Sequence, residues 1–203
     1  MSKSSIGPAP AERRVYAAWF EGLLVRALRP QLTPALRAEL RNAGVDLEQP
    51  LAEHYPAAVR LECLRLLRIH LFDGKSDDQA WHELGLAAVG GFHLTLVGQA
   101  FSLIYRMLGP RSLMKRAGAL LSSTNNYVSA FAVERGPFRW ELRLEGADLP
   151  PAYYMGMVVA ALEFCDASNP QVQLISQLGE QLVISCGWSP PVSRAGAERT
   201  QAR

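Results

Sequence analysis

The sequence lacks the patterns that identify most enzymes and membrane-spanning proteins. Across its 203 residues, no apolar run reaches the roughly 18–20 residues that a membrane-spanning helix needs. No glycine-rich segment has the spacing of a phosphate-binding loop or a dinucleotide-binding turn, and no G-x-S-x-G nucleophile elbow occurs. The N-terminal segment has no apolar run after its basic end, so no signal peptide is predicted. We therefore expect a cytoplasmic protein that is not an enzyme and does not span a membrane.

Cysteine and histidine are also scarce. The three cysteines, Cys63, Cys165 and Cys186, lie far apart in apolar surroundings, which predicts reduced, buried thiols. The four histidines do not combine with the cysteines in the spacing of a metal site, so neither a metal ion nor a resident cofactor is expected. The net charge is only +2, and the basic residues are not interleaved with exposed aromatic residues. Nucleic acid is therefore not an expected partner.

The clearest positive signal is the alternation of apolar and polar residues in the last third of the chain. In residues 139–145, Trp140, Leu142 and Leu144 fall on one face and the charged residues on the other, which predicts a half-buried antiparallel strand. Segments rich in β-branched and aromatic residues predict three further strands, at 127–133, 171–176 and 182–188. Residues 151–165 have apolar residues at helical spacing, so this part is predicted as a ββαββ unit.

The first 122 residues have helical periodicity. Apolar stripes predict helices at 15–28, 34–43, 57–72, 78–86 and 111–121. An apolar stretch interrupted by four glycines predicts a further helix over 85–108, in which the glycines suggest close backbone approach between helices or a kink. We therefore predict a single α+β domain over 13–189, in which a helical half (13–122) covers a four-stranded antiparallel sheet (123–189). Residues 1–12 and 190–203 are predicted to be disordered, and 122–126 to form the hinge between the halves.

A set of short motifs, in a fixed order, carries a resemblance to a known family. They are Leu32-Thr33-Pro34, Ala43-Gly44-Val45-Asp46-Leu47, Tyr55-Pro56, Leu84-Gly85, Leu108-Gly109-Pro110-Arg111, Thr124-Asn125-Asn126-Tyr127 and Gly187-Trp188. Over residues 13–189 the sequence resembles a Myxococcales-restricted family of uncharacterised bacterial proteins, and the resemblance implies no catalytic residues. The order of elements is similar to the fold of haem-NO-binding domains, 4-vinyl-reductase-type domains and TRAPP transport subunits. That likeness implies a space between helices and sheet for a haem, a small apolar ligand or an acyl chain.

Two groups of residues are candidates for binding. His93 lies in an apolar segment where an axial haem ligand could sit, and a histidine on the helix surface or a hydrogen-bonded interior histidine is the alternative. The candidates for ligand contact are Phe92, His93, Leu96, Tyr105, Asn125, Asn126, Trp140 and Tyr154. The candidates for contact with phosphate or an acidic partner are Arg106, Arg111, Lys115 and Arg116, with an exposed basic helix face as the alternative.

These observations favour a non-enzymatic sensory or adaptor module. It would bind a small apolar ligand or a protein partner between helices and sheet, and report the bound state through helix movement. A homodimeric scaffolding protein, with the sheet edge or the N-terminal helices as its interface, is the first alternative. A haem-based gas sensor that uses His93 is the second.

Overall fold

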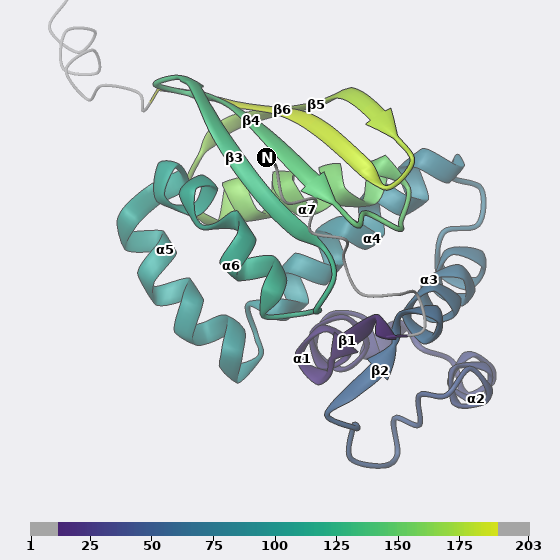
Figure 1. Ribbon diagram of the computed structural model, residues 1–203. Coiled ribbons are helices and arrows are strands. Elements are labelled where there is room, and N and C mark those ends of the chain that lie inside the picture. The colour runs from purple at the N-terminus through teal and green to yellow at the C-terminus, as the bar shows by residue number, and fades with distance from the viewer. Residues whose placement is uncertain (1–11, 191–203) are drawn as a thin grey trace, which may run out of the picture.

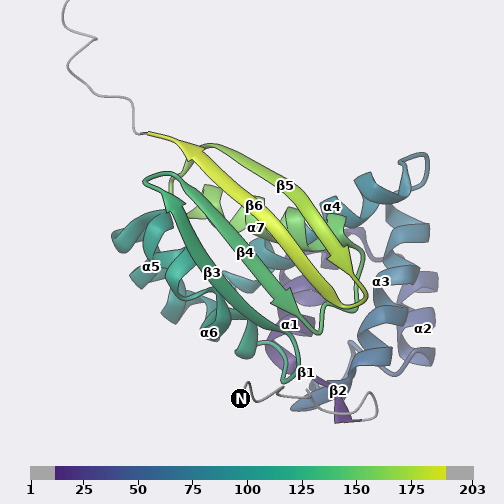
Figure 2. The same ribbon diagram turned by 45° about the horizontal axis from the view of Figure 1, so that its top comes forward.

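A four-stranded antiparallel sheet forms one layer of the structure, and helices lie against one of its faces (Figure 1). The structure, a computed structural model, describes residues 12–190; the segments predicted to be disordered, 1–12 and 190–203, lie outside it except at residues 12 and 190. The strands are Ser129–Gly136 (β3), Arg139–Glu145 (β4), Ser168–Leu178 (β5) and Gln181–Ser189 (β6). In Figure 2 the sheet lies in front of the helices, with its other face toward the viewer. The predicted α+β class with a four-stranded antiparallel sheet is confirmed.

The inner face of the sheet is apolar, and this fixes its register. The strands lie in the spatial order β3-β4-β6-β5, so β4 and β6 are the central pair. On that pair Trp140, Leu142 and Leu144 stand opposite Cys186, Ile184 and Leu182, and all six residues are buried. A shift of one residue would turn these side chains toward water, so the alternation along β4 determines which residues pair.

Helix α7 (Pro151–Phe164) packs against the sheet, and α4 (Asp77–Phe92) packs against α7. The two helices approach closely because each has a glycine at the contact. A Cβ at Gly85 of α4 would lie 2.1 Å from the carbonyl oxygen of Tyr153, and a Cβ at Gly156 of α7 would lie 2.1 Å from that of His82. Only glycine fits at such positions, so Gly85 and Gly156 serve the packing of α4 against α7.

The N-terminal segment does not form the single helix that is predicted over 15–28. Its elements are strand β1 (Arg14–Tyr16), helix α1 (Ala17–Phe20), π-helix η2 (Glu21–Ala27) and 3-10 helix η3 (Arg29–Gln31). Strand β1 pairs antiparallel with β2 (His54–Pro56), and the Tyr16 amide donates to the Thr124 carbonyl oxygen at 2.8 Å. These distant partners override the helical pattern at the start of the segment.

The next helices follow the prediction more closely. Helix α2 spans Pro34–Asn42 and helix α3 spans Ala57–Leu71. The Leu36 amide donates to the Thr33 hydroxyl at 3.2 Å, so Thr33 caps α2 as its sequence indicates. The buried side of α3 includes Cys63 and Leu67, which belong to the predicted apolar stripe.

The region predicted as a helix over 85–108 is divided by a bend of 92° between α4 and α5 (Leu96–Lys115), so it is not one straight helix, and the kink that its glycines suggest is present. The Thr95 hydroxyl donates to the Phe92 carbonyl oxygen, which ends α4, and accepts from the Gly98 amide, which caps α5. A Cβ at Gly98 would lie 1.8 Å from the Phe92 carbonyl oxygen, so the bend requires glycine. Helix α5 is kinked again at Gly109, where φ is +72°, and α6 (Ala117–Ser122) leads to the sheet.

None of the single helices within residues 12–190 has both the length and the apolar composition to cross a membrane. The bent pair α4 and α5 meets these two criteria only when the helices are taken together.

Candidate ligand cavity

An apolar cavity of about 130 Å³ lies where the helices meet the inner face of β4. It is bordered by parts of α1, α4, α5, α6, α7 and β4. The lining residues are Trp19, Ala88, Val89, Phe92, His93, Tyr105, Leu113, Met114, Ala117, Leu120, Leu121, Thr124, Leu142, Leu144, Tyr154, Met157, Val158, Ala161 and Phe164. Because the lining contains no Asp, Glu, Lys or Arg, the cavity favours an uncharged apolar ligand.

The cavity exists because bent helices enclose a space that straight packing would fill. Helix α4 ends at Phe92, and α5 leaves it at 92°, so the start of α5 does not continue along α7. Tyr105 of α5 and Phe164 of α7 contribute aromatic rings to the walls, and Leu142 and Leu144 of β4 contribute aliphatic side chains. The inward residues of a half-buried strand thereby become one wall of the cavity.

His93 is the C-cap residue of α4 and borders the cavity. Its ring stacks on Phe164, with 3.5 Å between ring centroids and an interplanar angle of 13°. Its Nδ1 lies 2.9 Å from the Ser102 hydroxyl oxygen, whereas its Nε2 is buried and has no partner among the described residues. Desolvation lowers the pKa of His93 to about 4, so the imidazole is neutral at neutral pH.

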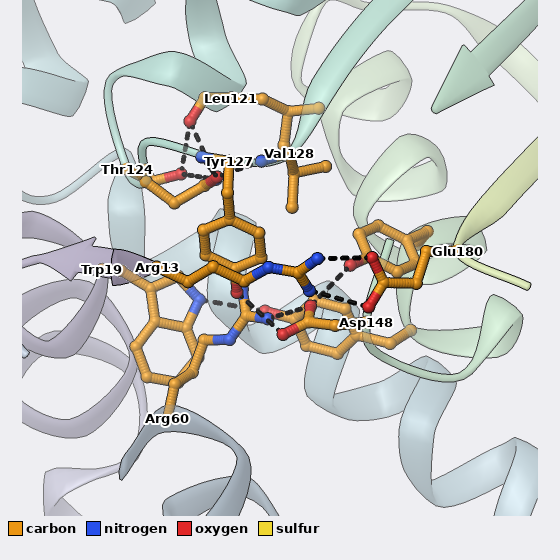
Figure 3. A network of polar contacts seen from close by, with 12 residues as sticks. Arg13, Trp19, Arg60, Leu121, Thr124, Tyr127, Val128, Asp148 and Glu180 are labelled. Carbon is orange, nitrogen blue, oxygen red and sulfur yellow. Dashed lines mark hydrogen bonds and ion pairs between the residues drawn. The ribbon is translucent and has the colours of Figure 1, made fainter. Parts of the chain in front are cut away.

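Asp148 joins one wall of the cavity to the N-terminal part of the chain (Figure 3). Its carboxylate accepts hydrogen bonds from Arg60 of α3, from the Tyr127 hydroxyl at 2.9 Å and from the Tyr154 hydroxyl at 3.3 Å. We call these four residues the Asp148 network. Burial raises the pKa of Tyr127 and of Tyr154, so both phenols keep the protons that they donate. Because Tyr154 also lines the cavity, the network is in direct contact with the site.

Trp19 and Arg13 extend these contacts. The Trp19 Nε1 donates to the Tyr153 hydroxyl at 3.0 Å, so Trp19, which lines the cavity from α1, is hydrogen-bonded to α7. The Arg13 guanidinium lies 5.2 Å from the centre of the Tyr127 ring and donates two hydrogen bonds of 2.7 Å to the Glu180 carboxylate in the turn between β5 and β6. Arg13, directly before β1, is thus connected to the segment before β3 and to the turn between β5 and β6, which lie at the same end of the sheet.

The structure brings together four of the eight predicted ligand residues, Phe92, His93, Tyr105 and Tyr154, in the cavity lining. Leu96 lies outside the lining at the start of α5 and is 81% exposed, because the bend before it turns it to the surface. Trp140 is buried on β4 but also lies outside the lining.

The two hinge asparagines also lie outside the lining, and their side chains bind backbone groups instead. Asn125 Oδ1 accepts from the amides of Tyr127 and Val128 at 3.1 and 2.6 Å. The Asn126 side chain accepts from the Arg14 amide and donates to the Glu12 carbonyl oxygen. The hinge is therefore a fixed turn that ties the N-terminal strand to the sheet half.

The four predicted basic residues do not converge on one point. The Arg106 guanidinium lies 5.6 Å from the centre of the Phe164 ring, and Arg111 forms an ion pair with Glu134. Lys115 and Arg116 are exposed at the end of α5. This arrangement resembles the alternative, an exposed basic helix face.

Sequence patterns do not identify Asp148 as the centre of its network, but the position of Arg60 indicates that a buried partner is needed. Arg60 lies three residues before Cys63 and seven before Leu67, so helical spacing places it on the buried side of α3. A charge on an apolar stripe requires a partner, and that partner is Asp148, 88 residues later. The sequence does not indicate which carboxylate meets it.

The three cysteines are buried and protonated, and the described part of the chain holds no candidate metal site. Burial raises the pKa of Cys63, Cys165 and Cys186 to about 12, 11 and 12, so the thiols stay protonated. Residues 12–190 contain no group of three or more His, Cys, Asp or Glu side chains that could hold a metal ion.

A haem does not fit this cavity, although His93 offers a nitrogen. Drug-sized ligands occupy pockets of roughly 300–1,000 Å³, and the volume here is about 130 Å³. A haem also carries two carboxylates, and no Lys or Arg belongs to the lining. The residues therefore match a smaller and uncharged molecule.

Comparisons with known proteins agree with the fold. The model of the family described as "Protein of unknown function (DUF2378)" matches residues 13–189. No curated protein sequence matches the chain. The similarity to a family without a characterised activity is confirmed, whereas its restriction to Myxococcales stays a prediction.

Solved H-NOX structures share the fold at low sequence identity. An H-NOX protein analysed for its mechanism of activation has 15% identity and a TM-score of 0.59, covering 85% of this chain and 96% of its own. An H-NOX variant from K. algicida in the Fe(II) unliganded state has 12% identity and a TM-score of 0.60, covering 86% and 97%. An oxygen-binding H-NOX domain related to soluble guanylate cyclases has 12% identity and a TM-score of 0.55, covering 87% and 94%. The predicted likeness to the haem-NO-binding fold is confirmed, and at these identities it concerns the fold alone.

Proposed function

We propose that this chain, which belongs to the family described as "Protein of unknown function (DUF2378)", is a sensory or adaptor module that binds a small apolar ligand. The observation that carries the proposal is the uncharged cavity between helices and sheet, whose walls come from six elements. The H-NOX fold supports a ligand-binding rather than a catalytic role, since one protein with this fold is an oxygen-binding domain. The protonated thiols also argue against nucleophilic catalysis.

Helix α5 is the element best placed to report the bound state. Its inner side chains Tyr105, Leu113 and Met114 line the cavity. Its outer side chains Leu103 and Met107 are 71% and 80% exposed, and Figure 1 shows the helix at the periphery of the molecule. A ligand that changes how α5 packs against the cavity would therefore change an exposed apolar surface.

That surface suits a protein partner of defined chemistry. Exposed apolar patches of this kind mark interaction sites, and the patch on α5 is bordered by Arg106, Lys115 and Arg116. No acidic residue occurs between Glu83 and Glu134. The matching partner surface is apolar with an acidic rim.

Native mass spectrometry tests the proposal, with a pair of variants on α7. Ala161 lines the cavity and its neighbour Ala160 does not. We expect Ala161→Leu to fill the space and abolish both a retained ligand mass and binding of fluorobenzene, whereas Ala160→Leu retains both. A protein with neither retained mass nor fluorobenzene binding would contradict the proposal. A retained haem with an absorption band that depends on His93 would replace it with the gas-sensor alternative.

A homodimeric scaffold is the second candidate, because one specific feature favours it. Strand β5 is an edge of the sheet and contains no charged residue over its length. Leu174, Ile175 and Leu178 are exposed on this strand, and long uncharged edges pair readily with a second copy. Light scattering at increasing concentration should show a dimer that Ile175→Lys dissociates. A wild-type monomer at high concentration would exclude this candidate.

A further inference from the structure

The tautomer of His93 follows from the partner of its Nδ1. The Ser102 hydroxyl oxygen lies 2.6 Å from the Gly98 carbonyl oxygen. Since a carbonyl oxygen only accepts, the single hydroxyl proton of Ser102 must lie in that bond. The 2.9 Å contact between His93 Nδ1 and Ser102 Oγ then requires Nδ1 to be the donor. In a neutral imidazole the other nitrogen, Nε2, consequently carries a lone pair.

That lone pair has no partner among the described residues. Four buried side-chain polar atoms lack one, namely Arg13 Nε, Arg60 Nε, His93 Nε2 and Trp140 Nε1. Of these residues only His93 belongs to the cavity lining. A buried acceptor without a donor costs free energy, and such exceptions in a folded protein call for an explanation. A ligand in the cavity that donates a hydrogen bond supplies one once the imidazole turns this edge toward the space, because Nε2 itself has almost no accessible surface.

A single water molecule is a poor hydrogen-bond donor for His93 Nε2. Ordered buried waters make about two to four hydrogen bonds. The Trp19 indole N–H, the Tyr154 hydroxyl and the Thr124 hydroxyl in the lining already donate to protein acceptors. The Tyr105 hydroxyl is then the one further donor in the lining, so a water bound to Nε2 would find few other partners among apolar walls, which disfavours it relative to a molecule that is itself mostly apolar.

The charge of the lining limits the ligand further. Burial keeps His93 neutral, and no lysine or arginine is present to neutralise a carboxylate or a phosphate. No aspartate or glutamate is present to neutralise an ammonium group. Burial of any unpaired charge is costly, so the donor on the ligand must be a neutral O–H or N–H.

The volume of the cavity limits the size of the rest of the ligand. A dry cavity of about 150 Å³ in another protein holds benzene. The cavity here is about 130 Å³, and its walls include the rings of Phe92, Tyr105 and Phe164. One small ring with one polar substituent fits this space and these walls.

We infer that the ligand is a neutral, benzene-sized molecule with a single O–H or N–H group that donates to His93 Nε2, as a phenol does. This inference rests on the proposed function, whose cavity it assigns to one chemical class. It assigns His93 the role of hydrogen-bond acceptor in place of an iron ligand.

Calorimetric titration with phenol and with fluorobenzene tests it, because the two probes have nearly the same size and only phenol donates. We expect phenol to bind wild-type protein about five- to tenfold more tightly, the factor that one net hydrogen bond supplies. In His93→Leu the preference should be lost or reversed, because phenol would then bury a hydroxyl without an acceptor. Ser102→Ala removes the acceptor that fixes the tautomer, so it should reduce the preference while fluorobenzene binding stays unchanged.

Each other outcome has a separate meaning. Equal binding of both probes to wild-type protein would overturn the role of His93 and leave the proposed apolar site intact. Binding of neither probe would overturn the proposed function together with this inference. A phenol preference that persists in His93→Leu would place the acceptor elsewhere and also overturn the inference.

Discussion

Asp148 accepts hydrogen bonds from three different parts of the chain, so its ion pair with Arg60 differs from the surface pairs of the molecule. The side chains of Arg60 and Asp148 are 4% and 17% exposed. Removing one member of a buried pair leaves the other charge desolvated without compensation, which costs far more than losing an exposed pair. The ion pair of Arg60 and Asp148 should therefore have a large effect on the free energy of unfolding.

Arg60→Met should lower the free energy of unfolding by about 3–5 kcal/mol, because it leaves the Asp148 carboxylate buried without a cation. Arg65→Met on the same helix is the matched control, since Arg65 pairs with Glu62 at the surface and should matter by less than about 1 kcal/mol. Urea unfolding followed by tryptophan fluorescence measures both. Equal losses in the two variants would show that the Asp148 network does not stabilise the fold.

His93 should make stability depend on pH in a defined window. Its pKa falls from an ordinary 6.5 to about 4 in the folded protein, so the unfolded chain takes up the proton first. Stability is therefore complete above about pH 6.5 and declines as the pH falls toward 4. The difference in unfolding free energy between wild type and His93→Gln, measured from pH 7 to 5, isolates this effect because the other histidines cancel. A difference that is independent of pH would contradict it.

At the scale of elements, the predictability of each segment depends on where its partners lie. Strand β4 begins and ends at the predicted residues, because the alternation around Trp140, Leu142 and Leu144 is local. Strand β1 is missed because it exists only through pairing with β2 and the bond to Thr124. The bend between α4 and α5 is suggested by the glycines but not located by them, because it depends on Thr95, which ends one helix and caps the next.

The residues of the candidate site also differ in how far the sequence indicates them. Phe92, His93, Tyr105 and Tyr154 line the space between helices and sheet, whereas their contact with a ligand stays a prediction. Asp148 lies in a connection between a strand and a helix, where no period indicates its orientation. Its contact with Arg60 depends on the final packing of α3 against the sheet half.

Two glycines of α4 should respond in opposite directions to alanine. Gly85→Ala places a Cβ 2.1 Å from a backbone oxygen of α7, so the helices must separate, at a cost of about 1–3 kcal/mol or more. Gly90→Ala meets no atom within 4 Å and should stabilise by about 0.5–1 kcal/mol, because alanine favours the helix. Thermal unfolding of the two variants gives the comparison. Stabilisation by Gly85→Ala would show that α4 and α7 do not pack this closely.

At the scale of the whole molecule, the cavity lies between two regions that differ in burial. On one side Tyr154 leads through Asp148 to Arg60 and the N-terminal strands, a buried polar network with fixed geometry. On the other side α5 contributes Tyr105 to the lining, but much of its outer apolar surface lies in water. A ligand in the cavity contacts both regions, and the less buried one has more freedom to respond.

Hydrogen exchange should therefore localise the response to ligand. With saturating fluorobenzene we expect slower exchange in α5. The ligand packs against the side chains of α5 that line the cavity, and these contacts are absent when the cavity is empty. Helix α2, which contributes no lining residue, serves as the internal control and should exchange at an unchanged rate. Protection spread equally over α2 and α5 would indicate general stabilisation of the folded state by mass action rather than a movement of α5. Protection confined to α5, and absent in Ala161→Leu, would connect occupancy of the cavity to the exposed apolar surface through which an adaptor must act.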